Sequence, residues 1–196
     1  MLTLIFATNN QNKVKEIRSL LGSNIQIITL KEAGIDIEIP EPHQSLEENA
    51  TEKSSVIHRL TNKNCFSEDT GLEVEALNGE PGVRSARYAG DEANFKKNIH
   101  KLLQHMQGKK NRQARFRTVI SLIIDDTEYL FEGICKGLIT ETETGENGFG
   151  YDPIFIPEPA NKTFAQMSLE EKNQYSHRKK AMDKLIVFLK EKYGEG

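Results

Sequence analysis

The sequence has little of what marks a membrane, secreted or duplex-binding protein. Its only cysteines, Cys65 and Cys135, are far apart and lack metal-ligand spacing, so we expect a reduced, cytosolic protein. No apolar run approaches membrane-spanning length, and Leu2–Ala7 is too short for a secretory signal. The net charge of -3 gives no basic bias, so a nucleic-acid duplex is not an expected partner. These features predict a cytoplasmic protein that does not enter a membrane.

Internal repeats and low-complexity segments are absent as well. The hydrophobic fraction of 37% is modest, but the apolar residues gather into periodic runs, which argues for a folded chain and against disorder. A length of 196 residues fits one domain over residues 1–196, with room for two lobes that share a core.

Hydrophobic periodicity predicts strands and helices in alternation. Strands are expected at Leu2–Ala7, Ile25–Thr29, Cys65–Ser67 and Leu72–Ala76, with a hairpin of Phe116–Ile124 and Tyr129–Ile139 around Asp125-Asp126. Helices are expected around Val14, Ile17 and Leu21, from Leu46 to about Leu60, after an N-cap at Asp91, after a capping box of Ser168 and Glu171, and from near Ser176. The pattern indicates an α/β protein with a mixed, twisted sheet and two lobes around a cleft.

The segment from Gly148 to Pro153 combines two glycines, an aromatic ring and a carboxylate. The glycines allow the backbone to pass close to a ligand, and Phe149 between them can project its ring. Asp152 precedes a proline, which favours an extended conformation. These are the parts needed to hold a planar heterocycle and contact its edge. The alternative is an ordinary Gly/Pro loop with a buried Phe.

A polar segment follows the first expected strand and leads into a helix. It consists of Thr8, Asn9, Asn10, Gln11, Asn12 and Lys13. The first N–H groups of a helix are unsatisfied and its dipole favours an anion there, so this segment can hold phosphate with Lys13 adding a full charge. The Walker pattern is absent. The alternative is a helix cap with solvated amides.

Three acids form a second candidate group: Glu41, Glu68 and Asp69. The adjacent pair follows a short apolar strand, and we expect it at the strand end. Hard oxygen ligands there suit Mg²⁺, which also binds substrate phosphates, or one carboxylate takes a proton from water. The alternative is an acidic surface turn.

Two further pairs of polar residues are candidates for contacting a ligand. Asn49 and Lys53 are four residues apart and share one face of their expected helix; the alternative is a solvated helix side. His177 and Arg178, with Lys172 upstream, can donate to carbonyl oxygens or ring nitrogens. Positive charge at a helix start is disfavoured by the dipole, and such a conflict is typical of a functional site.

Together these segments resemble the inosine triphosphate pyrophosphatase family, whose members are XTP/dITP diphosphatases acting on non-canonical purine nucleotides. The resemblance covers nearly the whole chain, and the order and spacing of its parts are highly specific. The matching segments are Thr8–Lys13, Glu48-Asn49-Ala50 with Lys53, Glu68–Leu72, Pro81–Val83 with Ser85–Tyr88, Gly148–Pro153, Glu171-Lys172 and Ser176–Arg178.

The resemblance implies a fold, an activity and roles for residues. The fold is an elongated mixed sheet with two lobes around a long cleft, and members are usually homodimers. The implied activity is Mg²⁺-dependent hydrolysis, with Mn²⁺ as a substitute, of a purine nucleoside triphosphate to the monophosphate and pyrophosphate. The implied roles are phosphate binding by Thr8–Lys13 and Lys53, proton acceptance and metal binding by Asp69, a second metal contact by Glu41, and substrate binding by Thr70, Phe149, Gly150, Tyr151, Asp152, Lys172, His177 and Arg178.

The sequence departs from the family pattern at four places. Asn9 stands where glycine is frequent, Glu68 replaces a common Asp, and Pro40 and Pro42 flank Glu41 where a pair of acids is usual. Thr70 stands for a common Ser and keeps the hydroxyl. Two other functions remain open: a house-cleaning pyrophosphatase for other modified nucleotides, such as pyrimidines, and a catalytically silent nucleotide sensor. Retention of a candidate base and two lysines argues against the sensor.

Overall fold

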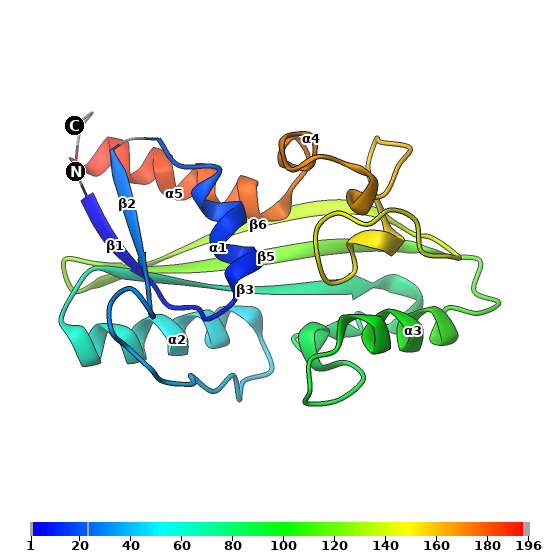
Figure 1. Cartoon of the computed structure of the whole chain (residues 1–196), viewed down its shortest axis with the longest axis horizontal. Coiled ribbons are helices and arrows are strands. Elements are labelled where there is room, and N and C mark those ends of the chain that lie inside the picture. Colours follow the sequence, from blue (N-terminus) through cyan, green and yellow to red (C-terminus); the bar gives the residue numbers. More distant parts are fainter. Residues whose placement is uncertain (1, 23, 194–196) are drawn as a thin grey trace. The chain divides into compact units, whose positions relative to one another are not determined.

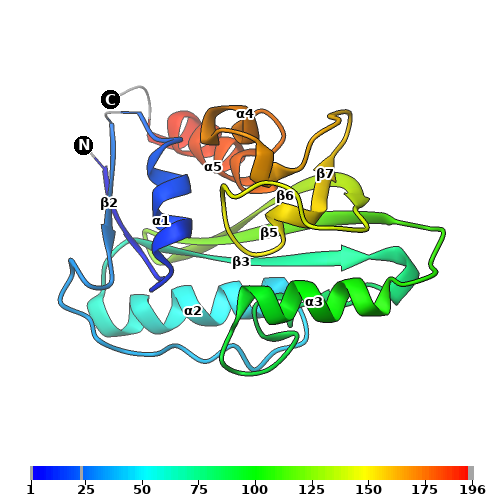
Figure 2. The same cartoon turned by 45° about the vertical axis from the view of Figure 1, so that its right-hand side comes forward.

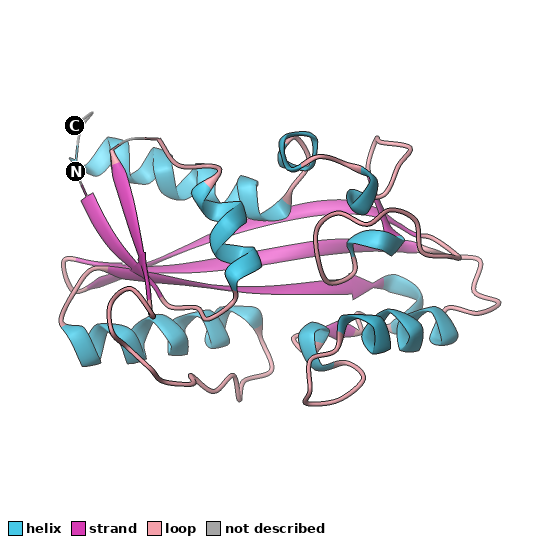
Figure 3. Ribbon diagram, viewed as in Figure 1, coloured by secondary structure: helices cyan, strands magenta, loops and turns pink. Residues whose placement is uncertain are grey.

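The computed structural model describes residues 2–22 and 24–193 of the chain. Figures 1 and 3 show strands with helices beside them, as expected for an α/β protein. In chain order the strands and helices are β1 (Leu2–Phe6), α1 (Gln11–Arg18), β2 (Ile25–Thr29), α2 (Leu46–Thr61), β3 (Cys65–Val74), β4 (Pro81–Gly82), α3 (Phe95–His105), β5 (Gln113–Ile124), β6 (Thr127–Ile139), β7 (Phe155–Pro157), α4 (Leu169–Asn173) and α5 (His177–Tyr193). No described helix is long and apolar enough to cross a bilayer.

The strands form one mixed sheet in the order β2-β1-β3-β5-β6-β7, with β4 paired to β3. β1 runs parallel to both β2 and β3, whereas β4 and β7 are antiparallel to their neighbours. The parallel pairs require helical crossovers, and α1 and α2 supply them. The expected mixed sheet with flanking helices is confirmed, as is the hairpin of β5 and β6.

The chain divides into two compact units. The first takes in the chain up to Asp69, Thr118–Gly133 and the chain from Arg178 on. Figures 1 and 2 show α2 on one side of its strands and α1 and α5 on the other. Accordingly Phe66 packs with α1 and α5, while the preceding Cys65 packs with α2. Side chains alternate between the two faces of a strand, and this alternation also decides where the polar residues of β3 point.

The second unit comprises Thr70–Arg117 and Ile134–His177. It has its own core, in which the rings of Phe116, Phe155 and Phe164 pack edge-on or tilted against one another. Each unit therefore buries its own apolar residues. The cleft expected between lobes stays a prediction.

Two boundaries differ from the expectations. Cys65–Val74 is one continuous strand, so Glu68 and Asp69 lie within it and not at its end. Gly71 permits this because a Cβ there would lie 2.7 Å from the carbonyl oxygen of Gly82, on the paired strand β4. Asp91 as a helix cap was wrong: Asn94 caps α3, its side chain accepting from the N–H of Lys97.

Candidate active site

The junction of β1 and α1 is built by its own side chains. Asn10 is the N-cap of α1, and its side-chain oxygen accepts from the N–H groups of Asn12 (3.0 Å) and Lys13 (3.2 Å). Thr8 Oγ1 accepts from the N–H of Asn10 at 3.2 Å. Asn9 donates to the carbonyl of Ile37. An anion at this helix start would therefore compete with Asn10 for two N–H groups, so the charge of Lys13 would attract an anion more strongly than the backbone.

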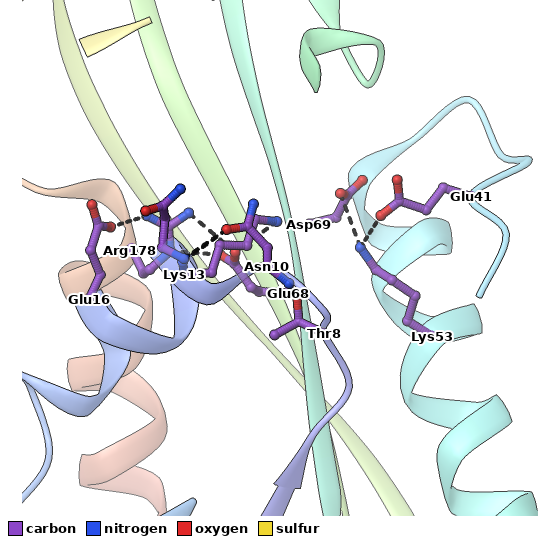
Figure 4. A network of polar contacts seen from close by, with 10 residues as sticks. Thr8, Asn10, Lys13, Glu16, Glu41, Lys53, Glu68, Asp69 and Arg178 are labelled. Carbon is purple, nitrogen blue, oxygen red and sulfur yellow. Dashed lines mark hydrogen bonds and ion pairs between the residues drawn. The ribbon is translucent and has the colours of Figure 1, made fainter. Parts of the chain in front are cut away.

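Glu68 holds Lys13 and Arg178 on one face of β3 (Figure 4). Glu68 Oε1 lies 2.9 Å from Lys13 Nζ. Arg178 donates to both oxygens of Glu68, at 3.1 and 3.2 Å, and also to Glu16 on α1. The order Glu16, Arg178, Glu68, Lys13 alternates in charge, so the two acids and the two bases balance one another.

Electrostatics keep this network ionised. Burial opposes a charge on Glu68, but Arg178 and Lys13 outweigh it and hold the pKa of the carboxyl far below its ordinary value. Burial likewise opposes the charge of Arg178, and Glu68 and Glu16 outweigh it and raise the pKa of the guanidinium. Glu68 is therefore ionised at neutral pH and paired with these cations.

Asp69 lies on the opposite face of β3, toward α2 (Figure 4). Lys53 on α2 lies 3.2 Å from Asp69 Oδ1 and also donates to Glu41. Lys53 and Asp69 are buried, whereas the Glu41 side chain is 28% exposed. One ammonium thus joins two carboxylates that come from distant parts of the first unit.

Asp69 keeps one oxygen available in this arrangement. Its Oδ2 is buried and has no hydrogen-bond partner among the described residues, although buried polar atoms are ordinarily paired. Burial raises the pKa of Asp69 against the charges of Lys53 and Lys13, and Glu41 raises it further. A carboxylate with a raised pKa and an unpartnered oxygen is suited to accept a proton.

The same two carboxylates fit the chemistry of Mg²⁺. Asp69 and Glu41 offer hard oxygen ligands, and the unpartnered Oδ2 supplies a coordination position. The part of the chain that the structure describes holds no group of three acidic, histidine or cysteine side chains that could enclose a metal. Such a site fits Mg²⁺ only if substrate phosphates and water complete its shell.

All the candidate base-binding residues except Arg178 lie in the second unit. Asp152 Oδ2 accepts from the N–H of Phe149 at 3.0 Å and from Lys172 Nζ at 2.6 Å. Lys172 Nζ also lies 5.2 Å from the centroid of the Phe149 ring. Gly148 has φ +75, and a Cβ there would lie 2.0 Å from Asp152 Oδ2. The loop therefore needs glycine at position 148, so that the carboxylate of Asp152 can accept from the N–H of Phe149.

The predicted extended conformation of Asp152 was wrong. Asp152 begins a 3-10 turn, Asp152–Ile154, because its buried ion pair with Lys172 and its bond to Phe149 override the local preference. The ring of His177 is buried and stacks on Phe116, with centroids 4.7 Å apart. Tyr151 donates through its hydroxyl to the carbonyl of Ser85.

The structure thus brings sequence candidates together in two groups in the first unit and in a third, made of Phe149, Asp152 and Lys172, in the second. Within the first unit it joins Lys13 to Glu68 and Arg178, and Lys53 to Asp69 and Glu41. It does not bring Glu68 to the face of Asp69, so Glu68 as a metal ligand has no support from this geometry and stays a prediction.

Other candidates have different surroundings from those expected. The Asn49 side chain is buried against the backbone of His43. Gln11 and Asn12 are exposed, and Thr70 and Gly150 are partly buried. Sequence reasoning missed Glu16, although its position three residues after Lys13 on the same helix could have indicated a shared face.

Comparison with known proteins agrees with this fold and these residues. The structure of the Staphylococcus aureus Ham1 protein matches with a TM-score of 0.88 and 40% identity, covering 97% of this chain and 99% of that one. The structure of a HAM1 protein from Coxiella burnetii matches with a TM-score of 0.89 and 34% identity, covering 97% of this chain and 100% of that one. The fold is therefore that of the Ham1 proteins.

The sequence comparisons identify the family. The Ham1 family model matches residues 4–188. The dITP/XTP pyrophosphatase of Flavobacterium johnsoniae is 50% identical over 188 residues, which are 96% of this chain and 98% of that protein. The dITP/XTP pyrophosphatase of Porphyromonas gingivalis is 47% identical over 190 residues, which cover 96% of this chain and 98% of that protein. The chain belongs to the Ham1 family, and the resemblance drawn from its motifs is confirmed.

Proposed function

We propose that this protein hydrolyses the non-canonical purine nucleoside triphosphates ITP, dITP and XTP to the monophosphate and pyrophosphate. Relatives named dITP/XTP pyrophosphatases that match it over nearly their whole length support this substrate class. The observation that carries the chemistry is Asp69, which pairs with Lys53 through one oxygen and keeps the other unpartnered.

Asp69 is the proton acceptor in this proposal. A water beside Oδ2 attacks the α-phosphorus while its proton passes to the carboxylate. The bond from the α-phosphorus to the oxygen bridging the α and β phosphates breaks, and pyrophosphate leaves with that oxygen. The raised pKa of Asp69 favours this proton transfer.

The two lysines stabilise the charge that develops on the phosphates. Lys13 is held by Glu68, and its side chain is 16% exposed, so the ammonium can meet a phosphate oxygen. Lys53 is held between Asp69 and Glu41. Both donors are therefore positioned before substrate binds.

Mg²⁺, with Mn²⁺ as a substitute, is the proposed cofactor, and Asp69 and Glu41 would hold it. When bound, it neutralises charge on the leaving pyrophosphate. The carboxylate pair and the unpartnered Asp69 oxygen support this assignment.

Phe149 is proposed to stack on the purine, with Asp152 and Lys172 holding the loop in place. The partly buried ring beside a buried ion pair supports this role. His177 and Arg178 stay candidates for contacting the 6-oxo edge of the base. In this structure the guanidinium of Arg178 donates to Glu68 and Glu16, which favours a second role in holding Lys13.

The experiment is a measurement of pyrophosphate release from ITP, XTP, dITP, ATP, GTP and dTTP under saturating Mg²⁺. We expect the first three to be preferred. Preference for dTTP would favour the pyrimidine alternative, and binding without release would favour the sensor. Hydrolysis of ITP in ¹⁸O-water should put the label in IMP; label in pyrophosphate would mean attack at the β-phosphorus.

Two wider properties belong to the same proposal. We expect a homodimer, as the family resemblance implies, and sedimentation equilibrium tests it. We expect action in the cytoplasm, where the nucleotide pool lies; the two buried cysteines, both free of disulfide bonds, are consistent with that compartment.

A further inference from the structure

Asn49 binds the backbone of one residue through both ends of its side chain. It lies on α2 and is 1% exposed. Its Oδ1 accepts from the N–H of His43 at 3.0 Å, and its Nδ2 donates to the carbonyl of His43 at 3.2 Å. Both ends of the buried amide therefore bond to protein backbone.

His43 belongs to the segment that carries Glu41. Between Ile35 and Ser45 this segment forms no helix or strand, so its position depends on side-chain contacts. Pro40 and Pro42 restrict the backbone on either side of Glu41. Fixing His43 therefore also fixes the direction in which the Glu41 carboxylate projects.

Asn49 and Lys53 act on this segment from the same face of α2. They are four residues apart, and residues at that spacing lie one above the other on a helix. Asn49 holds the backbone at His43, and Lys53 holds the carboxylate of Glu41. The same lysine contacts Asp69, so the helix face aligns the two carboxylates.

We propose that Asn49 is a positioning residue for the metal site, because it holds Glu41 where its carboxylate can act together with Asp69. The inference rests on the proposed function, since the metal and its substrate enter there. It assigns Asn49 no contact with the nucleotide, unlike the expectation from the sequence. Its effect reaches the metal only through Glu41.

The test measures Mn²⁺ affinity by electron paramagnetic resonance in the presence of α,β-imido-ITP, a non-hydrolysable analogue. Asn49→Ala should weaken Mn²⁺ binding by about 10–100-fold, the range for residues that orient metal ligands. In a Glu41→Gln background the same substitution should have no further effect, because the residue through which it acts is gone. If Asn49→Ala does not fold, Asn49→Ser is used in its place, because serine is too short to bond both the N–H and the carbonyl of His43.

Asn98 provides a matched control. It is 2% exposed on α3, and it also bonds backbone groups with both ends of its amide, accepting from Ala89 N–H and donating to the carbonyl of Ala86. Asn98→Ala should lower the melting temperature as Asn49→Ala does, but leave Mn²⁺ affinity unchanged.

Unchanged Mn²⁺ affinity in Asn49→Ala, or a full effect in the Glu41→Gln background, would overturn the inference. Failure of the proposed function gives a different result, since the wild-type protein would then release no pyrophosphate from ITP. An active wild type with unaltered metal binding in Asn49→Ala would refute the role of Asn49 alone.

Discussion

Glu68 and Asp69 are adjacent on β3, yet their carboxylates serve opposite faces of the sheet. Glu68 Oε1 lies 2.9 Å from Lys13 Nζ, and Asp69 Oδ1 lies 3.2 Å from Lys53 Nζ. The strand pleat separates them. Both oxygens of Glu68 are paired with Lys13 or Arg178. Asp69, in contrast, has one oxygen with no hydrogen-bond partner among the described residues. This division leads to the first prediction.

Asp69→Asn should lower kcat by about 10²–10⁴-fold, the range for loss of a general base. The substitution keeps the size of the side chain but removes its proton-accepting charge. Kinetics on ITP and a melting curve measure the change. Asp126→Asn, at a side chain 85% exposed, should leave kcat unchanged. Turnover within a few-fold of wild type would mean that another group takes the proton.

Lys13→Ala and Lys53→Ala should each lower kcat/KM for every nucleotide by a similar factor. A phosphate contact does not depend on the base, so the ratio of kcat/KM for ITP to that for ATP should stay unchanged. Lys15→Ala, at an exposed lysine on the same helix as Lys13, is the control. The full nucleotide panel measures this. A change in base preference would mean that the substituted lysine does not bind phosphate.

Metal binding should depend on nucleotide because Lys53 neutralises Asp69 and Glu41. EDTA should abolish activity, and the wild-type protein alone should bind Mn²⁺ weakly. Lys53→Met should tighten Mn²⁺ binding without nucleotide on the order of tenfold, because a positive charge near both proposed ligands, Asp69 and Glu41, is removed. Titration calorimetry measures it, with Lys63→Met, at an exposed lysine, as control. Tight stoichiometric binding by the wild type would contradict this arrangement.

Arg178→Ala should lower the free energy of unfolding, and its effect on the preference for ITP over ATP tests a contact with the base. It leaves Glu16 and Glu68 without their shared cation, and removing one partner of a buried ion pair costs about 3–5 kcal/mol. Urea unfolding measures that loss. If Arg178 also contacts the 6-oxo edge, kcat/KM should fall far more for ITP than for ATP. An unchanged ITP/ATP ratio would assign Arg178 to the charge network alone.

Phe149→Ala should weaken all purines together, by about 1–3 kcal/mol if its ring stacks on the base. The matched control is Phe95→Ala, whose ring lies 6.1 Å from that of Phe149 and is 39% exposed; it should have a smaller effect. Binding of α,β-imido-ITP and α,β-imido-ATP gives the comparison. A loss confined to one purine would exclude simple stacking.

Local sequence signals predicted those elements whose cause is local. The capping box of Ser168 and Glu171 forms as expected, with both reciprocal bonds present. The hairpin turn at Asp125 and Asp126 also forms, with both residues at positive φ. Asn94, not Asp91, caps α3, since several cap-forming residues stand in a row and propensity cannot choose among them.

The sequence by itself determined the family, the candidate charged residues and most helix and strand positions, because these depend on residue types and their spacing. Only the tertiary structure decided which charges meet. Glu16 and Arg178 are far apart in the chain but joined in the core, and Asn49 reaches a backbone that no periodicity could identify. Partner choice depends on strand pleat and helix packing, which bring together residues that the chain order keeps separate.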